Sequence, residues 1–98
     1  MRKNLIWLTF DSIRSDRTSI AGYDRNTTPE LREINEDNAV AGECFSHAIW
    51  SQPSVTSMMT GKFPGVHGSG RHNDVLPENI STIAERLSSA GYYTQGFS

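Results

Sequence analysis

A short, continuous apolar run near the start of the chain, residues 5–10, constrains the fold more than any other feature. It is rich in strand-favouring residues, and such runs are typical of strands that are buried on both faces of a parallel sheet. The run stops at Asp11, which places a carboxylate at the carboxyl end of the predicted strand. Open α/β sheets build their sites at that edge. The sequence therefore predicts an α/β fold with Asp11 near its site.

Helix and strand patterns alternate after this run. One helix is predicted to start at Thr27-Thr28-Pro29-Glu30, with a threonine cap, a proline in the first turn and an early glutamate, and to fade near Asn38. A second is predicted from Pro53 to Gly61, and a third over 80–91 with a capping box of Thr82 and Glu85. Short strands are predicted over 40–49 and 92–97. Gly22 is expected in a turn, and 62–73 in a loop.

The length of the chain limits how much of this fold it can build. A parallel sheet is covered on both faces and usually has several strands. The 98 residues supply two or three strands. We therefore expect residues 1–98 to be an incomplete N-terminal part of a larger catalytic domain.

Composition excludes several classes of function. Nine basic and eleven acidic residues give a net charge of −2, which does not predict a nucleic-acid partner. Cys44 is the only cysteine, so an intrachain disulfide and a thiolate zinc cluster are excluded. The apolar run is too short for a secretory signal or a membrane span. These features predict a cytoplasmic chain with no membrane association.

Ser51 is the most informative residue in the sequence. Its hydroxyl directly precedes a predicted helix that has Pro53 in its first turn. The N–H groups of a helix start attract anions such as sulfate and phosphate. A hydroxyl, a hard cation and such a helix end are the parts needed to attack a tetrahedral oxyanion ester. Taken alone, Ser51 also suits a simple N-cap role.

The residues around Ser51 resemble the signature of the sulfatase family, which belongs with the alkaline phosphatases. In that signature a Cys or Ser precedes x-Pro-Ser-Arg, and Thr-Gly and a basic residue follow at fixed spacing. The positions that match without a gap are Ser51, Pro53, Ser54, Thr60, Gly61 and Lys62. Further matching segments run from 5–11 to 91–92, so the resemblance covers essentially the whole chain.

The resemblance implies a fold, a reaction and a site. The fold would be the N-terminal portion of an alkaline-phosphatase-like mixed, mostly parallel sheet flanked by helices. Ser51 would be the nucleophile, commonly as formylglycine in this family, and would also contact a divalent metal ion, Ca²⁺ by the family pattern. Asp11 would be a metal ligand. The substrate would be a small-molecule or carbohydrate sulfuric ester.

Two departures from the signature leave more than one function open. Val55 stands where the signature has the arginine that is read when formylglycine is made, and Ser12 stands where many sulfatases have a second aspartate. An unmodified Ser51 favours a phosphoric-ester hydrolase or phosphotransferase that forms phosphoserine. The sequence is also compatible with a non-catalytic truncated product and with a chain that is completed by self-association.

The remaining conspicuous residues have structural interpretations. His67 matches a family position, and we expect it to stabilise its loop. Cys44 is expected to be a small buried packing residue. The helical spacing of Val55, Met58 and Met59 predicts core positions, and Trp50 is expected to pack behind the turn that carries Ser51. Lys62 is expected to be solvated.

Overall fold

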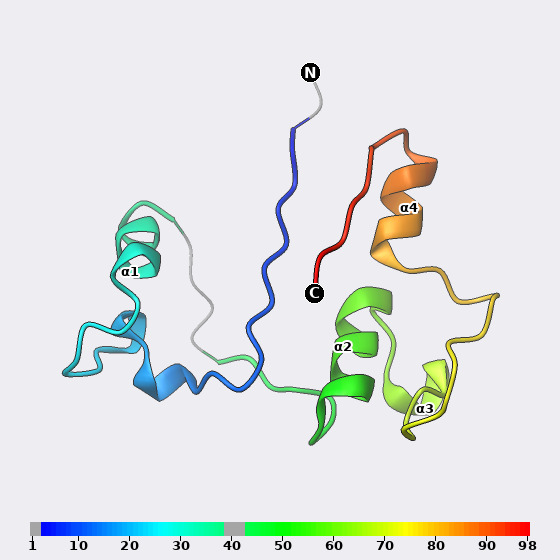
Figure 1. Cartoon of the computed structure of the whole chain (residues 1–98), viewed down its shortest axis with the longest axis horizontal. Coiled ribbons are helices and arrows are strands. Elements are labelled where there is room, and N and C mark those ends of the chain that lie inside the picture. Colours follow the sequence, from blue (N-terminus) through cyan, green and yellow to red (C-terminus); the bar gives the residue numbers. More distant parts are fainter. Residues whose placement is uncertain (1–2, 39–42) are drawn as a thin grey trace. The chain divides into compact units, whose positions relative to one another are not determined.

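The chain forms two compact units in a computed structural model that describes residues 3–38 and 43–98. The first unit is Met1–Cys44 and the second is Phe45–Ser98. Figure 1 shows helix α1 in the first unit and helices α2, α3 and α4 in the second.

The first unit contains two short 3₁₀ helices, η1 (Ser15–Arg17) and η2 (Ser19–Ala21), and helix α1 (Pro29–Glu36). Pro29 occupies the first turn of α1, which confirms the predicted start. Thr28 is the N-cap residue, as predicted, but its side chain makes no capping hydrogen bond. Its Oγ1 instead accepts the N–H of Ser19 at 2.9 Å, and Ser19 Oγ accepts the N–H of Thr28 at 3.0 Å. This exchange ties the start of α1 to η2.

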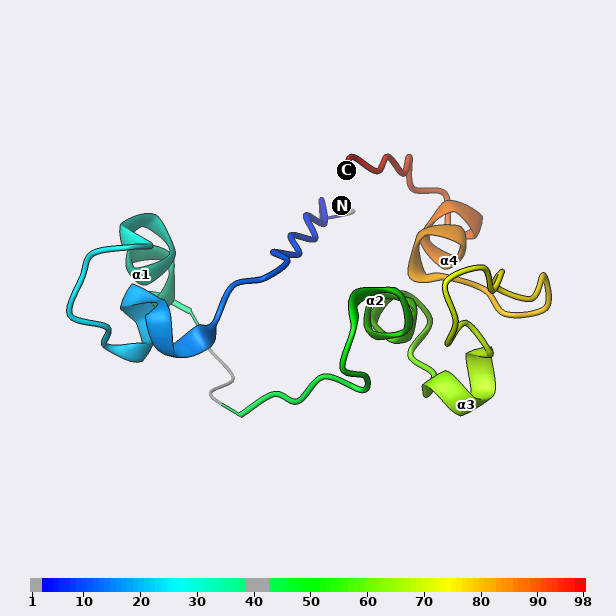
Figure 2. The same ribbon diagram turned by 60° about the horizontal axis from the view of Figure 1, so that its bottom comes forward.

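The second unit is built around α2 (Ser51–Thr60), which contacts both α3 (Pro64–His67) and α4 (Ile83–Ser89). Figure 2 shows α2 nearly end-on. Gly61 ends α2 in the left-handed conformation, with φ of 67°, as its position in the sequence predicts. The α3 turn lies inside the segment predicted to be a loop.

The capping box at the start of α4 is confirmed. Thr82 Oγ1 accepts the N–H of Glu85, and a carboxylate oxygen of Glu85 accepts the N–H of Thr82. Two N–H groups that a helix start leaves without helical partners are satisfied in this way. The local sequence therefore determines where α4 begins.

The predicted α/β architecture, with its mixed and mostly parallel sheet, is wrong for this structure. Residues 3–38 and 43–98 form helices and turns and contain no strand. The segments 3–10 and 92–98 carry no regular secondary structure (Figure 1). Their apolar composition favours a strand, but a strand also needs a neighbouring backbone that completes its ladder of hydrogen bonds. Part of the predicted 40–49 strand lies outside the described residues, and 43–49 forms none.

Burial differs from the sequence-based expectation as well. Among the described residues no hydrophobic side chain is buried, and the buried polar ones are Ser19, Ser54, Ser57, His67 and Ser69. Leu5 to Phe10, predicted to be buried on both faces, is exposed throughout. Val55, Met58 and Cys44 are also exposed, against their predicted packing roles, because two small units enclose too little volume to cover them.

No helix in the described part of the chain has the length and apolar character that a membrane span requires.

Candidate functional site

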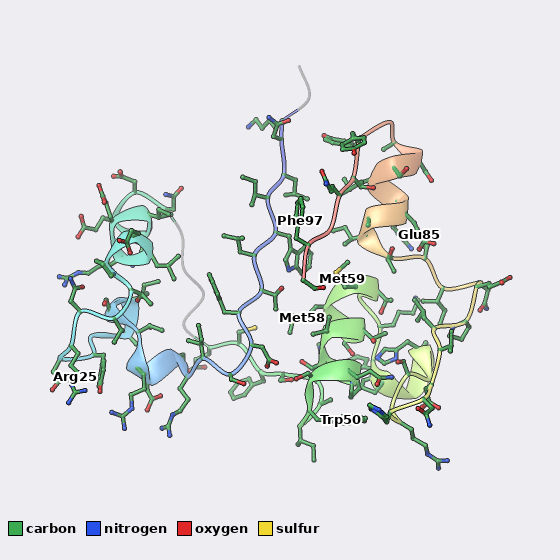
Figure 3. The ribbon with its side chains drawn as sticks, in the orientation of Figure 1. Arg25, Trp50, Met58, Met59, Glu85 and Phe97 are labelled. Atoms are coloured by element: carbon green, nitrogen blue, oxygen red, sulfur yellow. The ribbon has the colours of Figure 1, made fainter. Side chains whose placement is uncertain are left out.

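Ser51 is the first residue of α2, whereas the sequence predicted that it would lie directly before the helix. Trp50 occupies the N-cap position with an extended backbone and makes no side-chain capping bond. Trp50 is 42% exposed, so it covers the turn only in part (Figure 3). The helical start around exposed Ser51 is therefore built by backbone geometry and by the residues that follow.

The first turn of α2 begins with a weak backbone hydrogen bond. Its first helical hydrogen bond, from the N–H of Ser54 to the carbonyl of Trp50, is 3.4 Å long. Typical N–H···O bonds are about 2.9–3.0 Å. Side-chain contacts must therefore add to the stability of this turn.

One such contact is made by Ser54, the signature serine. Its buried Oγ lies 2.8 Å from Ser46 Oγ, and Ser46 Oγ donates to the carbonyl of Ala48 at 2.7 Å. Because each hydroxyl has one proton, Ser54 is the donor in the bond between the two serines. Ser54 thus anchors the helix start to the chain segment before it. Val55, next to it, is 42% exposed where the signature has arginine.

A second contact is made by Gln52, the residue after Ser51. Its Nε2 donates to the carbonyl of Arg71 at 2.9 Å and to Ser69 Oγ at 3.1 Å, with the carbonyl of Asp74 at 3.3 Å. An amide NH₂ has two protons, so these three acceptors share them. The Gln52 amide therefore attaches the loop of residues 69–74 to the first turn of α2.

The loop of residues 69–74 is also closed on itself. Asp74 Oδ2 accepts the N–H of Gly70 at 3.0 Å and the N–H of Arg71 at 2.7 Å. A carboxylate that accepts backbone N–H groups makes charge-assisted bonds, which are stronger than neutral ones. The loop consequently presents a fixed set of acceptors to Gln52.

His67 joins α2 to α3 from inside the second unit. Its side chain is completely buried. The N–H of Ser69 donates to Nδ1 at 3.0 Å, and Nε2 lies 3.0 Å from the buried Oγ of Ser57. Since Nδ1 accepts, the geometry assigns the neutral tautomer with its proton on Nε2, which donates to Ser57. The predicted loop-stabilising role of His67 is confirmed.

Asp11 lies in the first unit, at the end of the extended segment and in an exposed turn. Ser12, which follows, adopts a φ of +60°, an uncommon conformation for a residue other than glycine. Ser51 belongs to the second unit, and each side chain is placed only within its own unit. Their predicted sharing of one metal ion stays a prediction.

Asp11 and Ser51 supply suitable donor types for a hard cation but too few of them. Calcium takes about six to eight oxygen ligands. Among residues 3–38 and 43–98, no group of three or more His, Cys, Asp or Glu side chains is placed to hold a metal ion.

The charged residues near Asp11 pair with each other. Arg14 donates to both carboxylate oxygens of Asp16, at 3.0 and 2.8 Å. The hydrogen bonds from Arg14 hold the pKa of Asp16 below its ordinary value, and the same pair raises the pKa of Arg14. Both side chains are exposed, so this ion pair contributes little stability.

Sequence reasoning missed Gln52, Ser57, Ser69 and Asp74, which hold the second unit together. Ser57 and Gln52 carry no local signal, because their partners lie 10 to 22 residues away. Asp74 had a weak signal, since an aspartate near glycines often closes a turn. Lys62 is exposed, as predicted.

Comparisons with known proteins agree with the pattern around Ser51. The family model described as Sulfatase matches residues 3–98. An arylsulfatase of Clostridium perfringens (strain 13 / Type A) is 31% identical over 100 residues, which cover 97% of this chain and 20% of that protein. No solved structure was found to match the chain.

The chain belongs to the sulfatase family. It spans about a fifth of the length of the curated arylsulfatase that it matches. Members of this family generally use a divalent metal ion. The resemblance inferred from the residues around Ser51 is therefore confirmed.

Proposed function

We propose that the whole protein hydrolyses sulfuric esters and that Ser51, or a formylglycine made from it, is its nucleophile. The observation that carries this proposal is the position of Ser51 at the start of α2 in a chain of the sulfatase family. A ten-residue helix directs its N-terminal dipole toward the position where an anionic ester would bind. We propose a small-molecule or carbohydrate sulfate ester as the substrate.

The proposed reaction forms and breaks one bond in each of two steps. The oxygen on residue 51 bonds to sulfur, while the bond between sulfur and the ester oxygen breaks. The alcohol leaves with that electron pair and takes up a proton. If residue 51 is serine, water then displaces the sulfate from it. If residue 51 is formylglycine, water first adds to the aldehyde to give a gem-diol, one hydroxyl of the diol is the attacking oxygen and gives its proton to the alcohol, and the second hydroxyl loses its proton as the aldehyde re-forms and the sulfate leaves.

Asp11 is proposed as one ligand of a divalent cation, calcium, and the oxygen on residue 51 as another. When bound, such a cation polarises the ester oxygens and lowers the pKa of the attacking oxygen. The residues of this chain would contribute binding and orientation. Two ligands leave a hard cation short of its usual oxygen number, so we expect residues 1–98 alone to be inactive.

A phosphoric-ester hydrolase or phosphotransferase is the second candidate, and Val55 favours it. Val55 replaces the arginine of the signature, and we propose that Ser51 then stays a serine. Its Oγ would bond to phosphorus, expel the alcohol, and pass the phosphoryl group to water or to another alcohol. Mass spectrometry of the native protein distinguishes the two forms, because formylglycine is lighter than serine by two hydrogen atoms.

The test of the proposed function is a comparison of Ser51→Ala with Ser88→Ala, an exposed serine of α4. In the whole protein, Ser51→Ala is expected to lower kcat on p-nitrophenyl sulfate or p-nitrophenyl phosphate by about 10³-fold or more, since a nucleophile is removed. Ser88→Ala should retain activity. Unchanged turnover in Ser51→Ala would rule out the nucleophile. The ester that is cleaved decides between the two candidates.

Cytoplasmic residence is proposed as well, on the presence of a single cysteine, Cys44, whose side chain is exposed. A lone exposed thiol is suited to a reducing compartment. Cell fractionation of the native protein tests this proposal, and recovery from the medium would contradict it.

A further inference from the structure

The start of α2 carries the proposed nucleophile, yet the first helical hydrogen bond there is long. This bond, from the N–H of Ser54 to the carbonyl of Trp50, measures 3.4 Å. A reacting oxygen that is displaced by about 1 Å can cost roughly 10²-fold in rate. Some feature outside the helix backbone must therefore fix the orientation of this turn.

The Gln52 side chain supplies such a feature. Gln52 is adjacent to Ser51, and its Nε2 reaches three acceptors, all within residues 69–74, at 2.9 to 3.3 Å. The backbone carbonyl of Gln52 also accepts a hydrogen bond from the hydroxyl of Thr56, at 2.8 Å. Gln52 is thereby held from both its side chain and its backbone.

The acceptors of Gln52 are themselves fixed. Ser69 is 4% exposed, and its N–H donates to the completely buried ring of His67. The N–H of Arg71 donates to the carboxylate of Asp74, and the N–H of Asp74 donates to the carbonyl of Arg71, so that the loop is closed. No buried side-chain polar atom of the described residues lacks a hydrogen-bond partner. A fully satisfied polar network of this kind is rigid and specifies one geometry.

We propose that Gln52 is a positioning residue, which orients the turn that carries Ser51 by tying it to the loop of residues 69–74. The proposal rests on the function proposed above for Ser51. Gln52 touches no reacting atom, and it acts through the backbone that it shares with its neighbour. Its amide is suited to this role because it donates, and two of its acceptors are carbonyls.

The test uses two replacements of Gln52 in the whole protein. Gln52→Glu keeps the shape but sets a carboxylate against the carbonyls of Arg71 and Asp74. Gln52→Met keeps the length and loses the donor without adding charge, so it serves where the glutamate variant does not fold. The same replacements at Gln95, an exposed glutamine near the end of the chain, are the matched controls.

Both Gln52 variants are expected to lower kcat by about 10- to 100-fold while KM stays within about twofold, with kcat counted per folded molecule. Hydrogen exchange of the Ser69 amide should speed up in both, and both Gln95 variants should match the parent. A purely structural role would lower the amount of folded protein and leave kcat per folded molecule unchanged.

The outcomes separate this proposal from the one on which it rests. If the parent protein turns over an ester and the Gln52 variants keep its kcat, the positioning role is wrong and the proposed function stands. If the parent protein turns over neither p-nitrophenyl sulfate nor p-nitrophenyl phosphate, both proposals fall. A loss of kcat in the Gln52 variants alone supports both.

Discussion

The two units of the chain differ in how their hydrogen bonds organise them. In the first unit the side-chain bonds that join the turns around Ser19 span seven to ten residues, and the buried side chain among its described residues is Ser19. In the second unit they reach up to 22 residues and meet at the buried ring of His67. The second unit is therefore organised from its interior, and the first by bonds between neighbouring turns.

This contrast bears on the two proposed site residues. Ser51 begins a helix whose next residues take part in the polar network of the second unit. Asp11 follows an extended, exposed segment of the first unit. Each unit thus prepares its site residue to a different degree. The helix start that carries the proposed nucleophile is held by contacts within its own unit, and a positioning residue is expected there for the same reason.

The largest effect is expected from His67→Ala. The replacement removes two hydrogen bonds, so that the buried Ser57 hydroxyl and the Ser69 N–H lose the ring nitrogens with which they pair. Leaving buried polar groups unsatisfied costs about 1–3 kcal/mol each, so we expect about 3 kcal/mol in total. Amide exchange in α2 and α3 should accelerate by roughly 100-fold, while the amides of the first unit stay unchanged.

Variants and a control sharpen this prediction. His67→Asn places an acceptor near the Nδ1 position, so it should retain the Ser69 bond and lose less protection than alanine. His72→Ala changes an exposed histidine of the loop of residues 69–74 and should have little effect on amide protection. If His67→Ala and His72→Ala lowered amide protection equally, the buried network around His67 would contribute no more to stability than an exposed side chain does.

A smaller effect is expected from Ser19→Ala in the first unit. The variant loses the acceptor for the N–H of Thr28 and the 3.3 Å contact with Asn26. One net hydrogen bond is worth about 1 kcal/mol, so exchange at Thr28 should accelerate by roughly five- to tenfold. Ser15→Ala, at an exposed serine, is the control. A loss of protection in α2 as well would show that the units are not independent.

Local sequence signals predicted the helices better than the rest of the fold. Pro29, Gly61 and the pair Thr82–Glu85 act within one or two turns, and each marks a helix end that the structure confirms. Such signals depend on residues a few positions apart, so a single sequence displays them fully. Helix ends were therefore predictable.

The sheet and the core were not predicted correctly, for a physical reason. The composition of residues 5–10 favours a strand, but a strand exists only when another segment pairs with it, and no local pattern supplies that partner. Likewise, Val55 and Met58 have helical core spacing, but they are buried only if another surface covers them. Tertiary context decides both outcomes.

The residues of the candidate site were also predictable only where a local sequence pattern marks them. Ser51 and its helix follow from the signature, and His67 was assigned to its loop from the sequence. The partners of Gln52 were not predictable, because they lie 17 to 22 residues away. Which distant loop a polar side chain reaches depends on the folded path of the chain.

Thr82→Ala tests whether local capping acts independently of the interior network. The variant loses the acceptor for the N–H of Glu85 and should cost about 1 kcal/mol, as typical N-cap replacements do. Exchange in α4 is expected to accelerate by roughly fivefold, with the Ser69 amide unaffected. Thr94→Ala, at an exposed threonine outside the helices, is the control. Loss of Ser69 protection would show that α4 and the network are coupled.

The smallest effect is the pH dependence of the same cap. The N–H and hydroxyl of Thr82 donate to the carboxylate of Glu85 and hold the pKa of Glu85 below its ordinary value. A group with a lowered pKa in the folded state stabilises that state above the pKa of the unfolded chain, and the contribution is lost as pH falls through the folded value. The cap should therefore weaken below about pH 4.3, the ordinary glutamate pKa.

The chemical shift of the Thr82 amide proton, followed by NMR as the pH falls, reports this loss directly. In the parent chain it should move as Glu85 takes up a proton. In Glu85→Gln, which has no carboxylate at that position, the step should be absent, whereas Glu78→Gln, at an exposed glutamate before the helix, should retain it. A step that persists in Glu85→Gln would mean that another group titrates there. In that case the start of α4 would depend on more than its local cap.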